Sequence, residues 1–404
     1  MSIEFRDLKR QYDHIKYAVD NNIQNVINNT HFIGGSEVKE LEKTLASFVG
    51  REHCIACANG TDAISIALFA AGIGAGDAVF VPDFTFFSSG ECPATCGATP
   101  IFVDVRRDTY NIDINSLIAA IEKVISEGQL KPKAVVAVDL FGQPFDYEKV
   151  SAICEKYNLL LLEDAAQGFG GAYTCVDGTK KMAGSLGIIS TTSFFPAKPL
   201  GCYGDGGAIF TDDDELATAC RSIAVHGKDM AHPDDPNAKY NNARLGMNSR
   251  LDTLQAAILL AKFDAFKNEE LDAVNHVADR YTQLLADVEG LILPLIDDKY
   301  YSSWAQYTIQ LPENVDRTNV QKALKEEGIP TNIYYPKPMH TQGAFEGTRS
   351  SISDCPATEM LCKTVLCLPI HPYLEDSEID FIVDKIKCMS TRYCSKLIIK
   401  NDCL

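Results

Sequence analysis

Short apolar runs alternate with longer amphipathic stretches through the first half of the chain. We expect strands at residues 53–58, 78–82, 100–104, 134–139 and 158–163. Between them, apolar positions recur at helical spacing, which predicts helices over 61–68, 85–96, 115–126 and 147–157. The strands are continuously apolar, most clearly at the four leucines 159–162. This pattern is typical of a largely parallel sheet that helices cover on both faces.

The pattern changes in the second half of the chain. Apolar runs at 187–195 and 207–210 are followed by a helix over 213–226, a polar loop and a long helical region over 253–290. Beyond it we expect strands at 306–310 and 331–334 and helices at 318–327 and 377–389, which together indicate a small α+β domain. We therefore predict a large domain over 1–265 and a small domain over 266–404. The N-terminal helix, 13–29, is a segment that can pack on the small domain.

Composition narrows the class of protein. The 404 residues carry a formal net charge of −18, which argues against a nucleic-acid-binding surface. The chain has no run of eighteen apolar residues and no apolar segment typical of a signal peptide, so we expect a cytoplasmic protein without a membrane partner. Fourteen scattered cysteines favour reduced thiols. Cys54 and Cys57 form a CxxC without a second ligand pair, so we expect buried strand thiols and no metal site.

One lysine stands in a rigid, apolar setting. Lys198 is bracketed by Pro196 and Pro199, follows two phenylalanines and precedes the glycines of 204–207. An apolar and crowded environment disfavours the ammonium form, as a lysine that attacks a carbonyl requires. The alternative is an ordinary solvated loop lysine.

Candidate partners for this lysine lie at the carboxyl ends of the predicted strands, where such sheets bind ligands. Pyridoxal phosphate (PLP) would need a carboxylate at its pyridine nitrogen, which Asp164 can supply, and an anion site for its phosphate. The strand–turn–helix at Gly60 and Thr61 offers that anion site, with Ser193 as a further hydroxyl. A capped helix without a ligand explains Gly60 and Thr61 equally well. Phenylalanines 84, 86 and 87 are candidates to stack on the ring.

Seven segments in order resemble one family. They are Ala58–Ala63 (ANGTDA), Phe141–Gln143 (FGQ), Glu163–Gln167 (EDAAQ), Ser193–Lys198 (SFFPAK), Gly204–Gly207 (GDGG), His226–Gly227 (HG) and Asn248–Ala257 (NSRLDTLQAA). They are similar to the signature blocks of the DegT/DnrJ/EryC1/StrS family of PLP-dependent nucleotide-sugar aminotransferases. The resemblance covers residues 3 to 388 and implies the PLP-dependent transferase fold type I, which is like that of aspartate aminotransferase.

The resemblance also implies residue roles. Lys198 would form the Schiff base with PLP, and Asp164 would pair with the pyridinium nitrogen. Gln167 would contact the ring hydroxyl, Phe86 would stack on the ring, and Asn248 would reach the cofactor phosphate of a second subunit. Gly60, Thr61 and Ser193 would hold the phosphate of their own subunit's cofactor. A homodimer with shared active sites follows from the role of Asn248.

Within the family, the chain is most similar to enzymes that aminate the 3-keto group of a UDP-linked N-acetyl hexuluronic acid for surface polysaccharides, with L-glutamate as the expected donor. Arg250 is the candidate to hold the uronate carboxylate, although a structural arginine is an equal alternative. Tyr334 and Tyr335 are further candidate substrate contacts. Tyr334 departs from the subgroup, which tends to have a histidine there. Segments 174–183 and 229–240 look longer than usual, near the expected substrate entrance.

Other functions stay open at this point. One is amination at C4 of a UDP- or dTDP-linked 4-keto-6-deoxy sugar; another is a non-catalytic regulator on the same fold. A nicotinamide oxidoreductase is disfavoured, because the glycines of 72–76 follow a predicted helix and not a strand. The sequence leaves open the sugar, the carbon that is aminated, its stereochemistry and the pathway.

Overall fold

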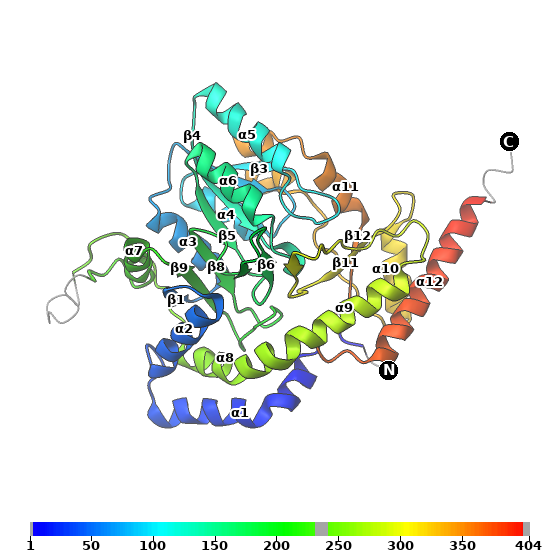
Figure 1. Cartoon of the computed structure of the whole chain (residues 1–404), viewed down its shortest axis with the longest axis horizontal. Helices are drawn as coiled ribbons and strands as arrows, with labels where there is room; N and C mark the ends of the chain where they lie inside the picture. The colour runs from blue at the N-terminus through cyan, green and yellow to red at the C-terminus, as the bar shows by residue number, and fades with distance from the viewer. Residues whose placement is uncertain (1–2, 231–240, 399–404) are drawn as a thin grey trace.

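A seven-stranded sheet forms the centre of the protein, which is seen here in a computed structural model that describes residues 3–230 and 241–398 (Figure 1). Its strand order is β1-β9-β8-β5-β4-β2-β3, and β9 runs opposite to the other six strands. The strands are β1 (His53–Cys57), β2 (Asp77–Pro82), β3 (Thr99–Val103), β4 (Lys131–Val138), β5 (Leu160–Asp164), β8 (Ile189–Ser193) and β9 (Gly207–Thr211). The expected mostly parallel sheet is confirmed.

Successive residues of each strand enter different cores, as the pleat requires. In β2, Val79 and Val81 pack on one face while Ala78 and Phe80 pack on the other. The first face is covered by α3 (Gly60–Ala70), α4 (Phe87–Thr95) and α7 (Asp214–Ala224), and the second by α5 (Ile114–Glu127), α6 (Tyr147–Tyr157), α2 (Ser36–Val49) and α8 (Thr253–Ala265). Burial on both faces explains why the strands read as continuous apolar runs.

Cys54 and Cys57 lie in β1 and are buried with free thiols. Burial raises the pKa of both thiols. The expectation of inert strand cysteines is therefore confirmed for this pair.

The remaining strands differ in part from the sequence prediction. A small sheet joins β6 (Ala172–Thr174), β7 (Lys180–Met182) and β10 (Tyr300–Tyr301), none of which was expected. A second joins β11 (Tyr307–Gln310) to β12 (Val365–Leu368). The strand expected at 331–334 is wrong, because only Asn332 pairs there, in a single bridge to Cys367.

The C-terminal part has an apolar core of its own. This core gathers α9 (Leu271–Leu285), α10 (Arg317–Glu326), α12 (Asp376–Ile398) and the two strands β11 and β12, while α11 (Pro356–Thr364) packs against the main sheet. The expected boundary at 265/266 falls inside one helical run, because a five-residue π-helical turn over Phe266–Glu270 connects α8 directly to α9.

The first helix, α1 (Leu8–Asn29), lies along α8 (Figure 1). Ile15 and Val19 of α1 pack against Ile258 and Ala265. Its start also reaches the C-terminal part, because Arg10 makes a bidentate ion pair with Glu378 of α12. The N-terminal helix thus contacts both predicted domains, with its apolar face on α8.

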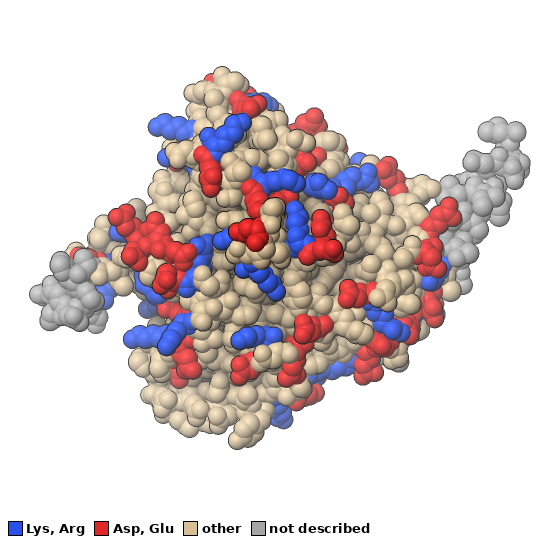
Figure 2. Space-filling view, viewed as in Figure 1, with Lys and Arg blue, Asp and Glu red and all other residues tan. Residues whose placement is uncertain are grey.

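Acidic and basic side chains are interspersed on the face seen in Figure 2, with acidic groups gathered near α7. In the described part of the chain, none of the helices has both the length and the apolar character needed to cross a bilayer.

Candidate active site

A cavity of about 620 Å³ opens at the carboxyl ends of the central strands. It collects residues from the ends of β1, β2, β5 and β8 and from the segment 334–342 of the C-terminal part. Most of the predicted site residues line it: Gly60, Thr61, Phe86, Asp164, Gln167, Ser193, Lys198, Tyr334 and Tyr335. The sequence placed these residues at separate strand ends, and the structure brings them to one site.

Lys198 sits in the loop that connects β8 to β9. The main chain of the loop folds back on itself, because the amide of Lys198 donates to the carbonyl of Phe195 over 2.8 Å, and that of Cys202 to the carbonyl of Phe194 over 2.8 Å. Burial lowers the pKa of the Lys198 amine to about 8, against the opposing effect of the Asp164 carboxylate. The amine is thus held closer to its neutral, nucleophilic form than a surface lysine.

Asp164 ends β5 and is buried with two donors on its carboxylate. The Ser89 hydroxyl donates to Oδ2 over 2.9 Å, and the amide of Ala166 donates to Oδ1 over 3.2 Å. Burial raises the pKa of Asp164, while these donors and the nearby Lys198 amine oppose the rise. A buried carboxylate that keeps its charge through such donors can pair with a cationic ring nitrogen.

The N-terminus of α3 faces the cavity as an anion site. The first amides of a helix have no acceptor within the helix. Here the Asn59 side chain accepts a hydrogen bond from one of them, the amide of Asp62, over 2.8 Å. Gly60 passes close to Ser193, so that a Cβ added at Gly60 would lie 2.7 Å from the Ser193 Cβ. The Thr61 hydroxyl shares a 2.7 Å hydrogen bond with Ser88. Hydroxyls and amides therefore converge where a phosphate would sit.

Gln167 and two aromatic residues form another wall of the cavity. The side-chain Oε1 of Gln167 accepts from the amide of Phe141 over 2.8 Å, and its Nε2 donates to the Tyr335 hydroxyl over 3.1 Å. Phe86 is 53% exposed although it lines the cavity, with its ring 6.4 Å from that of Tyr335. The exposed ring of Phe86 offers a flat apolar face to a ligand.

Two predicted residues do not join this cavity. Asn248 and Arg250 are exposed, and neither lines the cavity of its own chain. Segment 174–183 includes β7 and also lies outside the cavity lining, while residues 231–240 of the segment 229–240 are outside the described residues. The role of Asn248 at a second subunit's cofactor and the role of Arg250 at the uronate carboxylate both stay predictions.

Some residues around the site were not predicted from the sequence. Ser88 and Ser89 bond to Thr61 and Asp164, and their position in the first turn of α4, just after a strand end, is the signal that could have revealed them. Gln306 lines the cavity with a buried Oε1 that has no partner in the described structure. Lys337 lines it as well, from segment 334–342.

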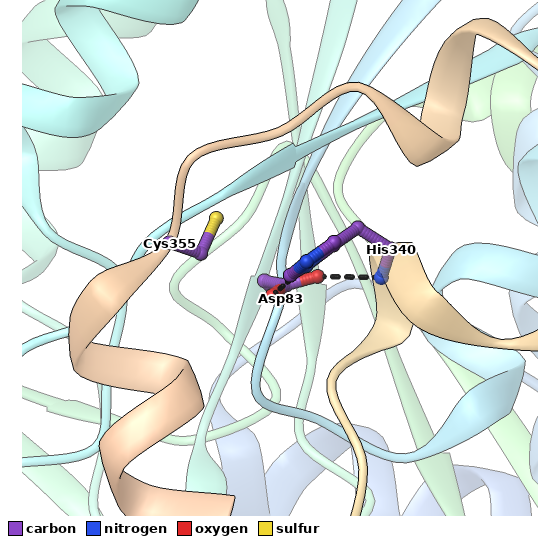
Figure 3. A group of neighbouring side chains, drawn as sticks. All are labelled: Asp83, His340 and Cys355. Carbon is purple, nitrogen blue, oxygen red and sulfur yellow. Dashed lines mark hydrogen bonds and ion pairs between the residues drawn. The ribbon is translucent and has the colours of Figure 1, made fainter.

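Segment 334–342 is anchored beside the cavity by a buried cluster of three side chains (Figure 3). Asp83, just after β2, accepts from the backbone amide of His340 over 2.8 Å and contacts its Nδ1 over 2.7 Å. Cys355 completes the cluster, with all three polar side-chain groups within 4.8 Å of one another. Both carboxylate oxygens of Asp83 are thus engaged by His340, which fixes the cavity wall to the main sheet.

Comparison with known proteins decides the family. The DegT/DnrJ/EryC1/StrS aminotransferase family matches residues 13–387. The chain belongs to this family. It is an aminotransferase, as the sequence blocks indicated, and its architecture is that of PLP-dependent fold type I.

Two curated relatives span nearly the whole chain. The UDP-2-acetamido-2-deoxy-3-oxo-D-glucuronate aminotransferase of Pseudomonas aeruginosa is 44% identical over 94% of this chain and 98% of its own length. The "pleiotropic regulatory protein" of Geobacillus stearothermophilus is 40% identical over 96% of this chain and 98% of its own length.

Two solved structures share the fold. The DegT/DnrJ/EryC1/StrS aminotransferase from Brucella abortus superposes with a TM-score of 0.89 at 44% identity, covering 96% of this chain and 99% of that one. The ntda protein from Bacillus subtilis, with the cofactor PMP bound, gives a TM-score of 0.85 at 28% identity, covering 96% of this chain and 85% of that one.

The residues present fit the cofactor of this family. Gly60 and Ser193 approach so closely that a Cβ at Gly60 would meet the Ser193 side chain, and their amides and hydroxyl form a cradle at the N-terminus of α3. Asp164 and Lys198 lie on the same cavity as this cradle, and each influences the pKa of the other. Phosphate, ring nitrogen and aldehyde carbon of PLP therefore each have a suitable partner.

Proposed function

We propose that this chain transfers the amino group of L-glutamate to the C3 ketone of a UDP-linked N-acetyl hexuluronic acid, in the synthesis of a surface polysaccharide. The carrying observation is that Lys198, Asp164 and the N-terminus of α3 face one cavity of about 620 Å³. The 44% identity to the Pseudomonas enzyme over nearly the whole of both chains supports the choice of substrate.

In this proposal PLP, when bound, supplies an electron sink that stabilises negative charge at the carbon next to the amine. Gly60, Thr61 and Ser193 bind the phosphate through amides and hydroxyls. Asp164 keeps the proton on the pyridine nitrogen, because its negative charge favours the cationic ring.

Lys198 anchors the cofactor and then acts as the general base and acid. With its pKa lowered to about 8, the amine would take the proton from Cα of glutamate and pass it to the aldehyde carbon of PLP. In the second half-reaction the amine would take a proton from that carbon and pass it to C3 of the sugar. Phe86 stacks on the ring, and Gln167 orients the ring hydroxyl from its position between Phe141 and Tyr335.

We further propose that the enzyme acts as a homodimer with shared sites. Asn248 and Arg250 have exposed side chains two positions apart, and neither lines the cavity of its own chain. In the dimer, Asn248 would reach the partner's cofactor phosphate, and Arg250 would meet the uronate carboxylate in the partner's cavity.

A regulator without activity is the second candidate, since one relative is called a regulatory protein. A chain that only regulates has no need of a buried lysine with a lowered pKa opposite a buried aspartate. Retention of both residues favours the enzyme.

The test is incubation of the purified protein with PLP, ¹⁵N-glutamate and a panel of UDP- and dTDP-linked keto-sugars. We expect ¹⁵N at C3 of the UDP-linked uronate and its absence with the Lys198→Ala variant. Incorporation at C4 of a 6-deoxy sugar would transfer the proposal to that substrate. No incorporation into any sugar by a protein that binds PLP would favour the regulator.

A further inference from the structure

Two basic side chains donate hydrogen bonds to main-chain carbonyls of the loop that carries Lys198. The guanidinium of Arg6 donates to the carbonyl oxygen of Lys198 itself over 2.9 Å and approaches that of Pro199 at 3.5 Å. The Lys262 amine donates to the carbonyl oxygen of Gly201. Arg6 comes from the segment before α1 and Lys262 from α8, so the loop is held by parts of the chain that are distant in sequence.

Lys262 is a fully buried cation and Arg6 a partly buried one, and taking a charge out of water costs free energy unless the charge is paired. Lys262 is 1% exposed, and burial lowers its pKa to about 8. Burial also lowers the pKa of Arg6, to about 10. Hydrogen bonds from charged donors are stronger than neutral ones, and three carbonyl oxygens within four residues receive them. The loop backbone is therefore fixed more firmly than its lack of regular structure suggests.

One carboxylate balances the two cations. Glu270, at the end of the π-helical turn between α8 and α9, is 5% exposed and raises the pKa of both Arg6 and Lys262. It accepts from Nε2 of Gln11 and from the hydroxyl of Tyr373, each over 2.7 Å. Glu270 is thus the carboxylate next to both cations that hold the loop of Lys198, and π-helical turns are often found at functional sites.

We propose that Arg6 and Lys262 are positioning residues of the aminotransferase reaction, because they fix the loop backbone that sets where the Lys198 amine stands. This inference rests on the proposed role of Lys198. Misplacement of a reacting amine by about 1 Å can cost about a hundredfold in rate. A loop without regular structure needs such external support.

The charge of Arg6 has a second effect on the amine. Burial and the Arg6 cation lower the pKa of the Lys198 amine, and the Asp164 carboxylate raises it. Arg6 in turn faces Glu270, and its charge also lowers the pKa of the buried His371. Removal of the Arg6 charge should therefore raise the pKa of the Lys198 amine.

The first measurement uses the protein without cofactor. The pH dependence of acetic anhydride labelling at Lys198, read by peptide mass spectrometry, reports the pKa of its amine. In Arg6→Met we expect the midpoint to rise by about half a unit. Arg10→Met is the matched control, since Arg10 ties the same segment to Glu378 without touching the loop, and its midpoint should equal that of the unmodified protein.

The second measurement is the single-turnover rate with glutamate in the PLP-loaded protein. Arg6→Met and Lys262→Met should each lose about tenfold in this rate with little change in the glutamate KM, and Arg6→Lys should recover part of the loss. Circular dichroism identifies variants that fold.

A folded Arg6→Met protein with an unchanged midpoint, or folded Arg6→Met and Lys262→Met proteins with unchanged rates, would overturn the inference, as would an equal loss of rate in Arg10→Met. Borohydride reduction of the loaded protein separates this failure from that of the proposed function. Covalent attachment of PLP at a lysine other than Lys198 would remove the assumed role of Lys198 itself.

Discussion

At the scale of single residues, burial moves Lys198 and Asp164 in the same chemical direction. It lowers the pKa of the amine and raises that of the carboxylate, so both are shifted toward their neutral forms. Their mutual attraction opposes both shifts. The balance leaves a lysine that can lose its proton near neutral pH beside a carboxylate that can still hold a charge.

Gly60 matters for its lack of a side chain and not for its backbone conformation. Its Cβ would lie 2.7 Å from that of Ser193, in the proposed phosphate site. We expect Gly60→Ala to weaken PLP binding by about tenfold or more, because helix and strand must move apart. Equilibrium titration of the PLP-free protein with PLP measures this change.

Gly343 provides the matched control. A Cβ added there meets nothing within 4 Å, and its φ is not positive, so Gly343→Ala should bind PLP as the unmodified protein does. Equal PLP affinity in Gly60→Ala would show that the phosphate lies elsewhere.

At the scale of elements, the position of segment 334–342 depends on the buried pair of Asp83 and His340. The hydrogen bond and charge of Asp83 raise the pKa of His340 above its ordinary value of 6.5, against the effect of burial. Because the folded form holds this proton more tightly, the pair stabilises the fold fully below about pH 6.5 and loses this contribution as the pH rises through the raised pKa.

We therefore expect the melting temperature of the PLP-free protein to fall, as the pH rises above about 6.5, by more than that of His340→Gln, which lacks the titrating group. Differential scanning calorimetry across this range measures the difference. His14→Gln, at an exposed histidine that pairs with Glu269 on the surface, is the control for the loss of a histidine. Parallel profiles for His340→Gln and the unmodified protein would contradict the prediction.

At the scale of the whole molecule, the proposed shared site makes two inactive variants complementary. If Arg250 acts in the partner's cavity, a mixed dimer of Lys198→Ala and Arg250→Ala has both defects in one site and none in the other. Random reassembly yields half mixed dimers, each with one working site. We expect the mixture to recover about a quarter of the unmodified activity, whereas either variant alone is inactive.

Transaminase assays after refolding the mixed variants together measure this recovery. Mixing Lys198→Ala with Asp164→Asn is the control, since both residues line the same cavity of one chain and no mixed dimer then has an intact site. Recovery in the control, or none with Arg250→Ala, would contradict the arrangement.

The sequence by itself determined the central strands and the loop of Lys198. Strands buried on both faces must be apolar throughout, and the turns at their carboxyl ends must carry the polar groups, so both features are written locally. The separate blocks around Gly60, Asp164 and Lys198 could be assigned to one site because parallel strands end at the same edge.

Only the tertiary structure decided the rest. β12 was not predicted, because it directly follows α11 and its partner is β11, some 55 residues earlier in the chain. A strand was wrongly expected at 331–334 instead. β6, β7 and β10 have only two or three residues each, too few to show a pattern. The hydrogen bonds from Arg6 and Lys262 to the loop of Lys198 connect positions that are far apart in the sequence. Such contacts between distant positions leave no periodic trace in the sequence, since their chemistry arises only when the chain is folded.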